Sequence, residues 1–449
     1  MTSKKIDPRD TLDSLIKAAK KAGADAADAI LIESISSSVS YRLGKLEDVE
    51  RAESADLGLR VFIGQKVAFI SSTDFSPEGV AALAPRAVSM ARLAPEDKFA
   101  VLAPRDLLAK SIPELDLDDP NEPSAEKLIQ LARDVEAAAM AVKGITNSEG
   151  GGASFSRDAV TLATSEGFSG SYAGTSLGIG VAVLAGEGTD MERDYDQASA
   201  RHASDLDPAE QVGQSAGEKT VARLGPRKVK SQGDLTVVFD PRVSAGLVGH
   251  FAGAISGSSI ARGVSFLKDK MGKPVFAPGV SIIDDPHQLR GHRSKPFDGE
   301  GVANRRMALI ENGVLTSWLL DCSSALQLGL TTTGHASRGT GGPPRPAPTN
   351  LYMGAGNISP QQLMSDIKTG FYVTDLMGMG VNGVTGDYSQ GAGGFWIENG
   401  AIAFPVSEVT IAGNLKDMFL KLTPANDLVF RYGTNAPTLR VEGMTLAGS

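Results

Sequence analysis

Cysteine and histidine are the scarce residues of this chain. One cysteine and five histidines occur among 449 residues. One cysteine cannot form an internal disulfide, and it cannot supply a cysteine-rich zinc or iron–sulfur site. Any metal chemistry must therefore depend on very few side chains.

Long apolar runs are also missing. The first residues, MTSKKIDPRDTLDS, lack the apolar core of a signal peptide, and no run approaches the length of a membrane span. With 44 basic and 53 acidic residues the net charge is −9, which repels a nucleic-acid backbone. We expect a cytoplasmic protein that binds neither membrane nor nucleic acid, with the basic clusters at 227–230 and 290–295 in solvated loops.

What is present favours a mixed α and β fold. Hydrophobic residues make up 41% of the chain but aromatic residues only 6%, so Ala, Val, Leu and Ile must form most of the core. Apolar spacing predicts amphipathic helices over 8–22 and 77–93. Residues 26–42 and 57–70 alternate as strands do, the second interrupted by a Gly-Gln turn.

Two pairs of similar segments within the chain indicate an internal duplication. The run LGLRVFI at 57–63 resembles LGIGVAV at 177–183, and RLAP at 92–95 resembles RLGP at 223–226. A Pro- and Asp-rich stretch, 112–123, separates the two copies, and the second copy opens with a helix predicted over 124–142.

The chain is therefore predicted to have an α+β fold with three parts. Residues 1–111 and 112–230 form duplicated sheet-plus-helix units, and 231–449 form a Gly-rich, mostly β C-terminal domain. Within that domain, GTGGPPRPAPT at 339–349 is too rich in proline for anything but an extended loop.

Three familiar motifs occur in the wrong context. The G-x-G-x-x-G at 378–383 is followed by VTGDYSQG, which does not favour the helix that a dinucleotide site needs. The G-x-S-x-G at 174–178 precedes a strand, whereas a nucleophile elbow precedes a helix. The phosphate-loop-like run at 213–220 is one residue short and lies in a predicted helix.

A few polar residues remain as candidates. His335 and Arg338 lie in TTTGHASRG, a run that either binds a peptide or carboxylate or is a loop hydrogen-bonded to itself. Cys322 has no basic neighbour in the sequence to lower its pKa, so it is predicted to be a buried residue that contributes only to packing. A buried helix is predicted over 241–259 with His250 in its middle, but a helical zinc site needs a second His and a Glu.

At this point the sequence resembles the TldD/PmbA family, and specifically its PmbA (TldE) branch. The resemblance covers nearly the whole chain. The segments that carry it are GHFAGAISG at 249–257, LIENG at 309–313, LGLTTTGH at 328–335, PTNL at 348–351, GVTGDYS at 383–389 and FWIENG at 395–400. We add Asn350 to His335 and Arg338 as candidate substrate-binding residues.

The resemblance implies how this chain differs from the catalytic branch. TldD proteins are zinc peptidases with an H-E-x-x-x-H helix and a Cys ligand near the C-terminus. On this sequence the first His falls on His250, the Glu on Phe251 and the second His on Ile255, while the Cys segment falls on FRYGT at 430–434. One ligand of three remains, so we expect no catalytic residue, no metal and no cofactor in this chain, with zinc only in a TldD partner.

The resemblance also implies a function. PmbA-type chains pair with a TldD-type zinc peptidase, and the pair degrades unfolded peptides and matures a peptide antibiotic. The isolated chain could instead form a homodimer, because the surface meant for TldD would otherwise expose apolar area.

Two alternatives stay open. An autonomous peptidase could combine His335 with Asp387 or Glu311, although nothing in the sequence brings them together. The chain could also act without proteolysis, as a modulator of DNA gyrase or of a toxin–antitoxin system.

Overall fold

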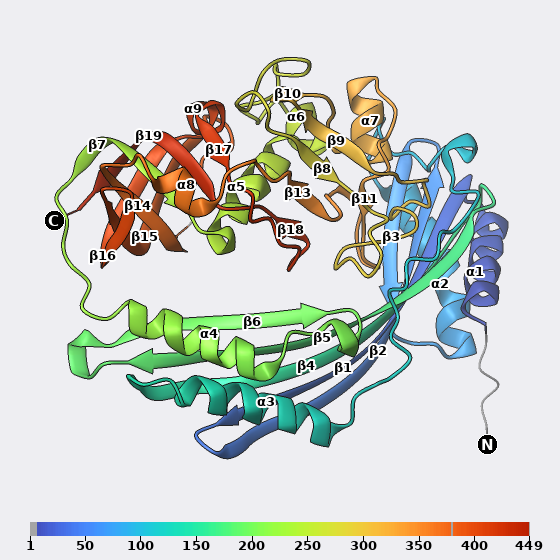
Figure 1. Cartoon of the computed structure of the whole chain (residues 1–449). Coiled ribbons are helices and arrows are strands. Elements are labelled where there is room, and N and C mark those ends of the chain that lie inside the picture. Colours follow the sequence, from blue (N-terminus) through green and yellow to red (C-terminus); the bar gives the residue numbers. More distant parts are fainter. Residues whose placement is uncertain (1–6, 379, 449) are drawn as a thin grey trace.

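The computed structural model describes residues 7–378 and 380–448. The N-terminal half forms one long sheet with helices on its outer face, and the C-terminal half lies over the inner face (Figure 1). In the described part no helix is long and apolar enough to cross a membrane.

The first unit has the order helix, three strands, helix. Its elements are α1 (Pro8–Ala22), β1 (Ala26–Arg42), β2 (Lys45–Ile63), β3 (Lys66–Ser72) and α2 (Pro77–Leu93). Helix α1 begins where the Asp7 side chain accepts a hydrogen bond from the Arg9 backbone, and it ends at Gly23, whose φ of 107° suits glycine. The two predicted helices are confirmed over 8–22 and 77–93.

The second unit repeats that order. Its elements are α3 (Ala125–Met140), β4 (Ile145–Thr164), β5 (Ser169–Ala185), β6 (Glu192–Ala200) and α4 (Ala209–Ala222). The two echoing sequence runs lie in β2 and β5, the second strand of each unit, and the RLAP and RLGP segments overlap or follow the last helices. The predicted duplication is confirmed at the level of the fold.

The two units share one antiparallel sheet. The strand order is β3-β2-β1-β4-β5-β6, and β1 pairs with β4 from Asp28 opposite Thr164 to Tyr41 opposite Gly151. Helices α1 and α2 pack on one end of the outer face and α3 and α4 on the other. On the inner face Ile30 packs with C-terminal residues such as Phe297, which fixes the C-terminal domain to this end of the sheet.

A closed barrel forms the far part of the C-terminal domain. It contains β7 (Gln232–Phe239), β14 (Thr369–Met377), β15 (Asp387–Glu398), β16 (Ala401–Asn414) and β19 (Leu439–Ala447), with β17 (Leu422–Pro424) beside β19. Pairing of β16 with β19 closes it. The predicted Gly-rich, mostly β domain is thus confirmed.

The rest of the domain joins the barrel to the sheet. A five-stranded sheet contains β8 (Ile282–Asp284), β9 (Met307–Glu311), β10 (Val314–Leu315), β13 (Leu351–Met353) and β18 (Thr434–Asn435). Strands β11 (Ala336–Ser337) and β12 (Arg345–Pro346) form a small ribbon. The helices are α5 (Pro241–Ala254), α6 (Gly257–Ala261), α7 (Cys322–Leu328), α8 (Pro360–Met364) and α9 (Leu415–Leu420).

Two sequence expectations change in detail. The helix predicted over 241–259 is two helices, because the Gly257 N–H bonds the Leu319 carbonyl at 2.7 Å and a Cβ at Gly257 would lie 2.6 Å from the Leu320 side chain. Strand β2 begins at Lys45, well before the predicted start at residue 57, and its exposed first half lacks apolar alternation.

The three motifs that lacked the right sequence context lie in a strand, a helix and a turn. Ser176 lies inside β5, and the run 213–220 lies inside α4. Of the G-x-G-x-x-G run, residue 379 lies outside the described part of the chain, and residues 380–386 form a turn before β15. Cys322 is buried, as predicted.

Candidate functional site

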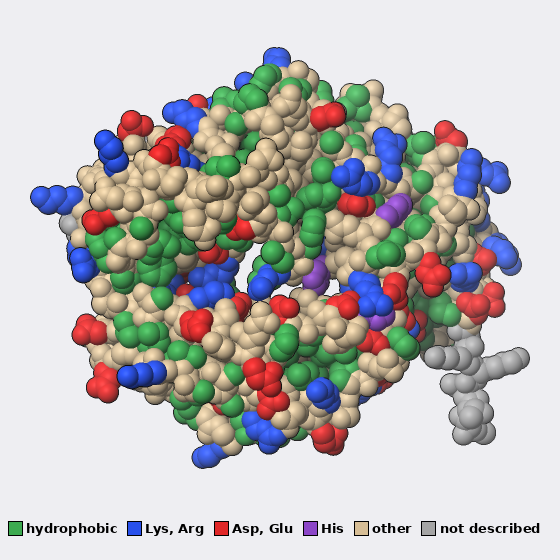
Figure 2. Space-filling view, in the orientation of Figure 1, with side chains coloured by type: hydrophobic (Ala, Val, Ile, Leu, Met, Phe, Trp, Pro, Cys, Tyr) green, Lys and Arg blue, Asp and Glu red, His purple; other side chains and the backbone are tan. Residues whose placement is uncertain are grey.

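A central hollow separates the inner face of the N-terminal sheet from the barrel. Three adjoining cavities of about 480, 420 and 310 Å³ surround Tyr432, which lines all of them. Figure 2 shows an opening between the two layers, with charged and histidine side chains gathered around it. Chain segments from both halves therefore line a group of adjoining cavities.

The floor of the hollow is made of very small residues. Along β5, side chains that point outward are apolar and packed under α3 and α4, as at Ile179 and Val181. The alternate positions Gly178 and Gly180 face the hollow, beside Ser154 of β4. The backbone of β5 is paired with β4 and β6 on its two sides, so this face offers mainly hydroxyl groups and leaves room above the sheet.

The segment between β17 and β18 reaches into the hollow from above. The Asn435 side chain accepts hydrogen bonds from the Arg431 and Tyr432 backbone N–H groups, both at 2.9 Å, which holds the segment in a turn. Phe430 packs edge-on against Tyr352 with ring centroids 5.0 Å apart, yet is 51% exposed. This is the segment on which the C-terminal Cys of the catalytic branch would fall.

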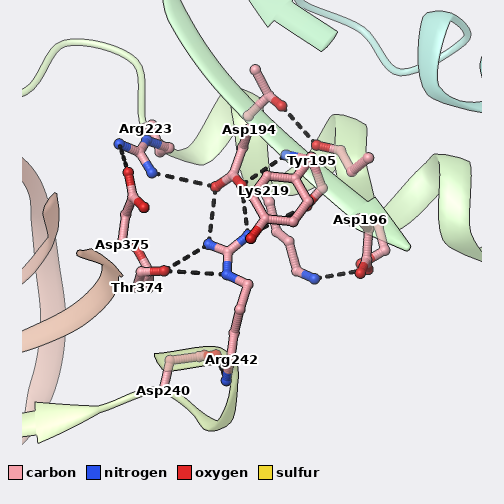
Figure 3. A network of polar contacts seen from close by, with 12 residues as sticks. Asp194, Tyr195, Asp196, Lys219, Arg223, Asp240, Arg242, Thr374 and Asp375 are labelled. Carbon is pink, nitrogen blue, oxygen red and sulfur yellow. Dashed lines mark hydrogen bonds and ion pairs between the residues drawn. The ribbon is translucent and has the colours of Figure 1, made fainter. Parts of the chain in front are cut away.

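A charge network joins the two halves at the edge of the hollow (Figure 3). Asp194 on β6 accepts hydrogen bonds from Arg242 at the start of α5, at 2.6 and 3.2 Å, and from Arg223 after α4, at 3.5 Å. Arg223 also lies 3.6 Å from Asp375 on β14, and the Arg242 guanidinium lies 5.2 Å from the centre of the Tyr195 ring. The network ties the sheet to the barrel.

A second ion pair lies beside the network on the same wall. Lys219 donates to Asp196 at 2.8 Å. Burial alone would raise the pKa of Asp196, but its hydrogen bonds with Lys219 and Ser215 outweigh burial and lower the pKa. Asp196 therefore stays ionised, and its charge is compensated inside the wall.

Helix α5 is anchored so that it runs along the domain core. Pro241 occupies its first turn, and the Asp240 side chain accepts hydrogen bonds from the Arg242 backbone at 2.9 Å and the Tyr372 hydroxyl at 2.7 Å. This cap places Arg242 in the charge network and His250 about two turns later.

His250 is a half-buried imidazole in an apolar setting. Its ring packs edge-on against Tyr388 with centroids 6.2 Å apart. Burial lowers its pKa, so the ring is neutral near pH 7. In the described residues no group of three or more His, Cys, Asp or Glu side chains lies in an arrangement that could hold a metal ion.

The positions beside His250 belong to the core. Phe251 is fully buried and packs edge-on against Phe276 at 5.2 Å, and Phe276 stacks on Phe419 at 4.4 Å. Ile255 is also fully buried. Aromatic and aliphatic groups therefore occupy the two positions that the family resemblance aligns with a Glu and a second His.

The three candidate substrate-binding residues are buried within loops. His335 lies 3.1 Å from Asp284 and 2.8 Å from Thr333 through its two ring nitrogens, so it is not paired with Asp387 or Glu311. Asn350 accepts from the Arg293 backbone at 2.8 Å and donates to the Asp285 carbonyl at 2.7 Å. These bonds order loops of the domain, and substrate binding by His335 and Asn350 stays a prediction.

Arg338 belongs to a buried charge cluster that the sequence analysis missed. It donates to Asp28 at 2.6 Å, and Asp28 also binds Arg60. Arg60 lies 3.5 Å from Glu300, so β1 and β2 are joined to the C-terminal domain by buried ion pairs. Asp28 within the apolar run AADAILI was the one signal that could have revealed it.

Glu300 is the unusual member of this cluster. Burial raises its pKa to about 7, the attraction of Arg60 opposes this rise, and the neighbouring Asp298 adds to it. Its carboxylate also accepts the Cys322 backbone N–H at 2.9 Å. Near neutral pH this carboxyl group therefore exchanges a proton inside the interface between the two halves.

Domain by domain, the chain matches a family of metallopeptidases. Family models described as PmbA/TldA metallopeptidase domain 1, central domain and C-terminal domain match residues 27–91, 118–224 and 232–448. The chain is 40% identical over 426 residues to the metalloprotease PmbA of Escherichia coli O157:H7, covering 94% of this chain and 92% of that protein. The chain belongs to the PmbA/TldD family, in its PmbA (TldE) branch.

Solved structures share the whole architecture. A Bacteroides thetaiotaomicron protein described as a candidate modulator of DNA gyrase superposes with a TM-score of 0.90 at 26% identity, covering 98% of this chain and 99% of that one. TldE from Thermococcus kodakarensis superposes with a TM-score of 0.84 at 22% identity, covering 97% and 99%. The second likeness concerns the fold alone.

Proposed function

We propose that this chain is the PmbA/TldE-type subunit of a cytosolic protease complex, pairing with a TldD-type zinc peptidase that carries the metal. The pair cleaves unstructured peptides, including precursors of peptide antibiotics. This chain supplies a chamber wall and a dimer interface. It lacks the zinc ligands and the general base.

One observation carries the proposal. The side chains beside His250 on α5 are Phe251 and Ile255, which are fully buried among apolar residues. Zinc sites in proteins use imidazole, thiolate or carboxylate ligands, and a catalytic site needs three of them. Neither neighbour provides a donor atom, so the residues present do not fit a zinc ion.

The test is peptide hydrolysis by the purified chain alone, by a TldD-type partner alone and by the two mixed. The proposal expects activity only when the partner is present, with loss of activity after zinc is removed by a chelator. Zinc-dependent hydrolysis by this chain alone would overturn the proposal.

A second candidate is modulation of DNA gyrase without proteolysis. It rests on the description that the Bacteroides relative carries. Incubating gyrase with the reconstituted pair separates the two candidates, because altered supercoiling with intact gyrase subunits favours modulation. Unchanged supercoiling removes this candidate.

A further inference from the structure

A separate cavity, which shares no lining residue with the three cavities of the central hollow, lies between the first unit and the C-terminal domain. It has a volume of about 410 Å³ and is bounded by β2 and β3, residues 97–101, helices α6 and α7, and the Pro-rich segment 343–346. Elements from the first unit and from the C-terminal domain thus meet around a space large enough for two or three amino-acid residues.

A buried guanidinium forms part of its floor. The Arg60 side chain is 5% exposed and lines the cavity beside Glu300. Its Nε donates to Asp28 at 2.9 Å and its Nη2 binds the same carboxylate. The remaining terminal nitrogen, Nη1, lies 3.5 Å from Glu300 Oε1, beyond good hydrogen-bond distance. Arg60 therefore has donor capacity left over in the cavity.

Two more guanidinium groups lie at the rim. Arg262 follows α6 and Arg345 lies in β12, and both are exposed. Within 7–378 and 380–448, neither forms an ion pair with a carboxylate within 4 Å, although Arg262 Nε donates to the Ser258 carbonyl at 3.0 Å. The cavity thus has three guanidinium groups from three separate elements.

The acidic residues of the cavity are already engaged. Asp321 caps α7 by accepting from the Ser324 backbone at 2.9 Å, and Asp97 accepts from the Phe99 backbone at 2.9 Å. Glu300 accepts from the Cys322 backbone. These backbone bonds orient the three carboxyl groups without neutralising them. The cavity is therefore mixed in charge, and its most available donors are the two exposed guanidinium groups at its rim.

The remaining wall is apolar. Its apolar lining residues include Phe62, Phe69, Phe99, Pro343 and Pro344. Aromatic and proline surface attracts an apolar group, whereas guanidinium groups bind a planar carboxylate in a bidentate manner. A ligand that satisfies both walls carries a carboxylate next to an apolar side chain.

We propose that this cavity binds the C-terminal residue of a peptide, with its carboxylate held by Arg262 and Arg345 over Arg60 and its apolar side chain against the phenylalanines. The nearby carboxyl groups disfavour a doubly charged phosphate and tolerate a singly charged carboxylate. The proposal rests on the proposed function for the origin of the peptide, but the binding itself requires this chain alone.

Calorimetric titration of the full chain with acetyl-Ala-Ala-Phe and with its C-terminal amide tests the site. The acid should bind at least about tenfold more tightly than the amide, and Arg262→Gln and Arg345→Gln should each weaken the acid by about tenfold. Arg133→Gln, on the exposed surface of α3, is the matched control and should change nothing. Inorganic phosphate at the same concentration should not displace the peptide.

Three outcomes would each overturn the proposal. They are equal binding of the acid and the amide, unchanged affinity for the acid in both arginine variants, and displacement of the peptide by phosphate. Both arginines are exposed, so thermal unfolding of the variants should match that of the unaltered chain. Because partner and added zinc are absent, failure here leaves the proposed function intact. Hydrolysis of the peptide by this chain would instead contradict the proposed function.

Discussion

At the scale of single residues, two buried positions carry our proposal that this chain is not the zinc-binding subunit. Phe251 packs in an aromatic cluster with Phe276 and Phe419, and Ile255 closes the end of α5. Such a cluster excludes water, which a metal-bound nucleophile requires. In our proposal, His250 is the one residue of the expected metal-binding set that this chain retains.

Phe251→Glu should destabilise the chain by more than about 3 kcal/mol, because it buries a carboxylate without a partner. Phe251→Leu, the control, should cost about 1 to 2 kcal/mol through lost packing. The free energy of unfolding in urea measures both. A Glu variant as stable as the Leu variant would show that this position is open to water or to a cation.

Glu300 should make stability depend on pH. Burial raises the pKa of Glu300 to about 7 in the folded chain, compared with 4.5 in the unfolded chain, so the folded state holds the proton more tightly. The resulting stabilisation is complete below pH 4.5 and is lost as pH rises through 7. Relative to Glu300→Gln, which cannot ionise, the unaltered chain should lose about 3 kcal/mol between pH 4.5 and 8.

Unfolding free energies measured across that pH range give the difference between the two proteins. Glu311→Gln, at an exposed position of β9, is the control and should track the unaltered chain. A constant difference between the unaltered chain and Glu300→Gln would mean that Glu300 does not titrate in this window.

At the scale of elements, the contact between β6 and α5 holds the hollow in shape. Asp194 is 4% exposed and Arg242 15%, so neither charge is well solvated outside this pair. Strand β6 is an edge strand, and this contact ties it to the barrel.

A double-mutant cycle with Asp194→Asn and Arg242→Gln measures that contact. Each single variant should cost about 2 to 4 kcal/mol by leaving a buried charge without its partner, and the coupling energy should exceed about 1 kcal/mol. The exposed pair Lys228 and Glu408 is the control, with an expected coupling below about 0.5 kcal/mol. Equal coupling in both pairs would contradict a structural role for the network.

Sequence patterns located elements well where one face is apolar. Leu12, Leu15 and Ile16 define α1, and the same reasoning locates α2. The first half of β2 was missed because it pairs on one side only and is exposed throughout. The barrel depends on pairs between strands distant in sequence, such as Phe371 of β14 with Val237 of β7, which periodicity does not reveal.

The candidate site was predictable only in part. The family resemblance predicts the replacement of a general base at Phe251 and of a metal ligand at Ile255, and the structure adds that both side chains are buried. The cluster of Asp28, Arg60 and Glu300 could not be predicted, because three-dimensional contact brings its members together from separate elements.

At the scale of the whole molecule, the fold consists of two layers, the duplicated sheet and the C-terminal domain, with a hollow between them. The duplicated sheet and the barrel are joined at one end by the apolar contact around Phe297 and at the other by the network around Asp194. The hollow between them is reached from the side that Figure 2 shows. In our account a TldD-type partner binds this chain, and the two chains together enclose the chamber in which peptides are cleaved.

Zinc content measured after gel filtration tests the central claim most directly. The chain alone and the chain mixed with a TldD-type partner are separated by mass, and zinc is measured in each peak. The account predicts no bound zinc in the chain alone and about one zinc for each one-to-one pair, held by the partner. Stoichiometric zinc in the peak of this chain alone would contradict it.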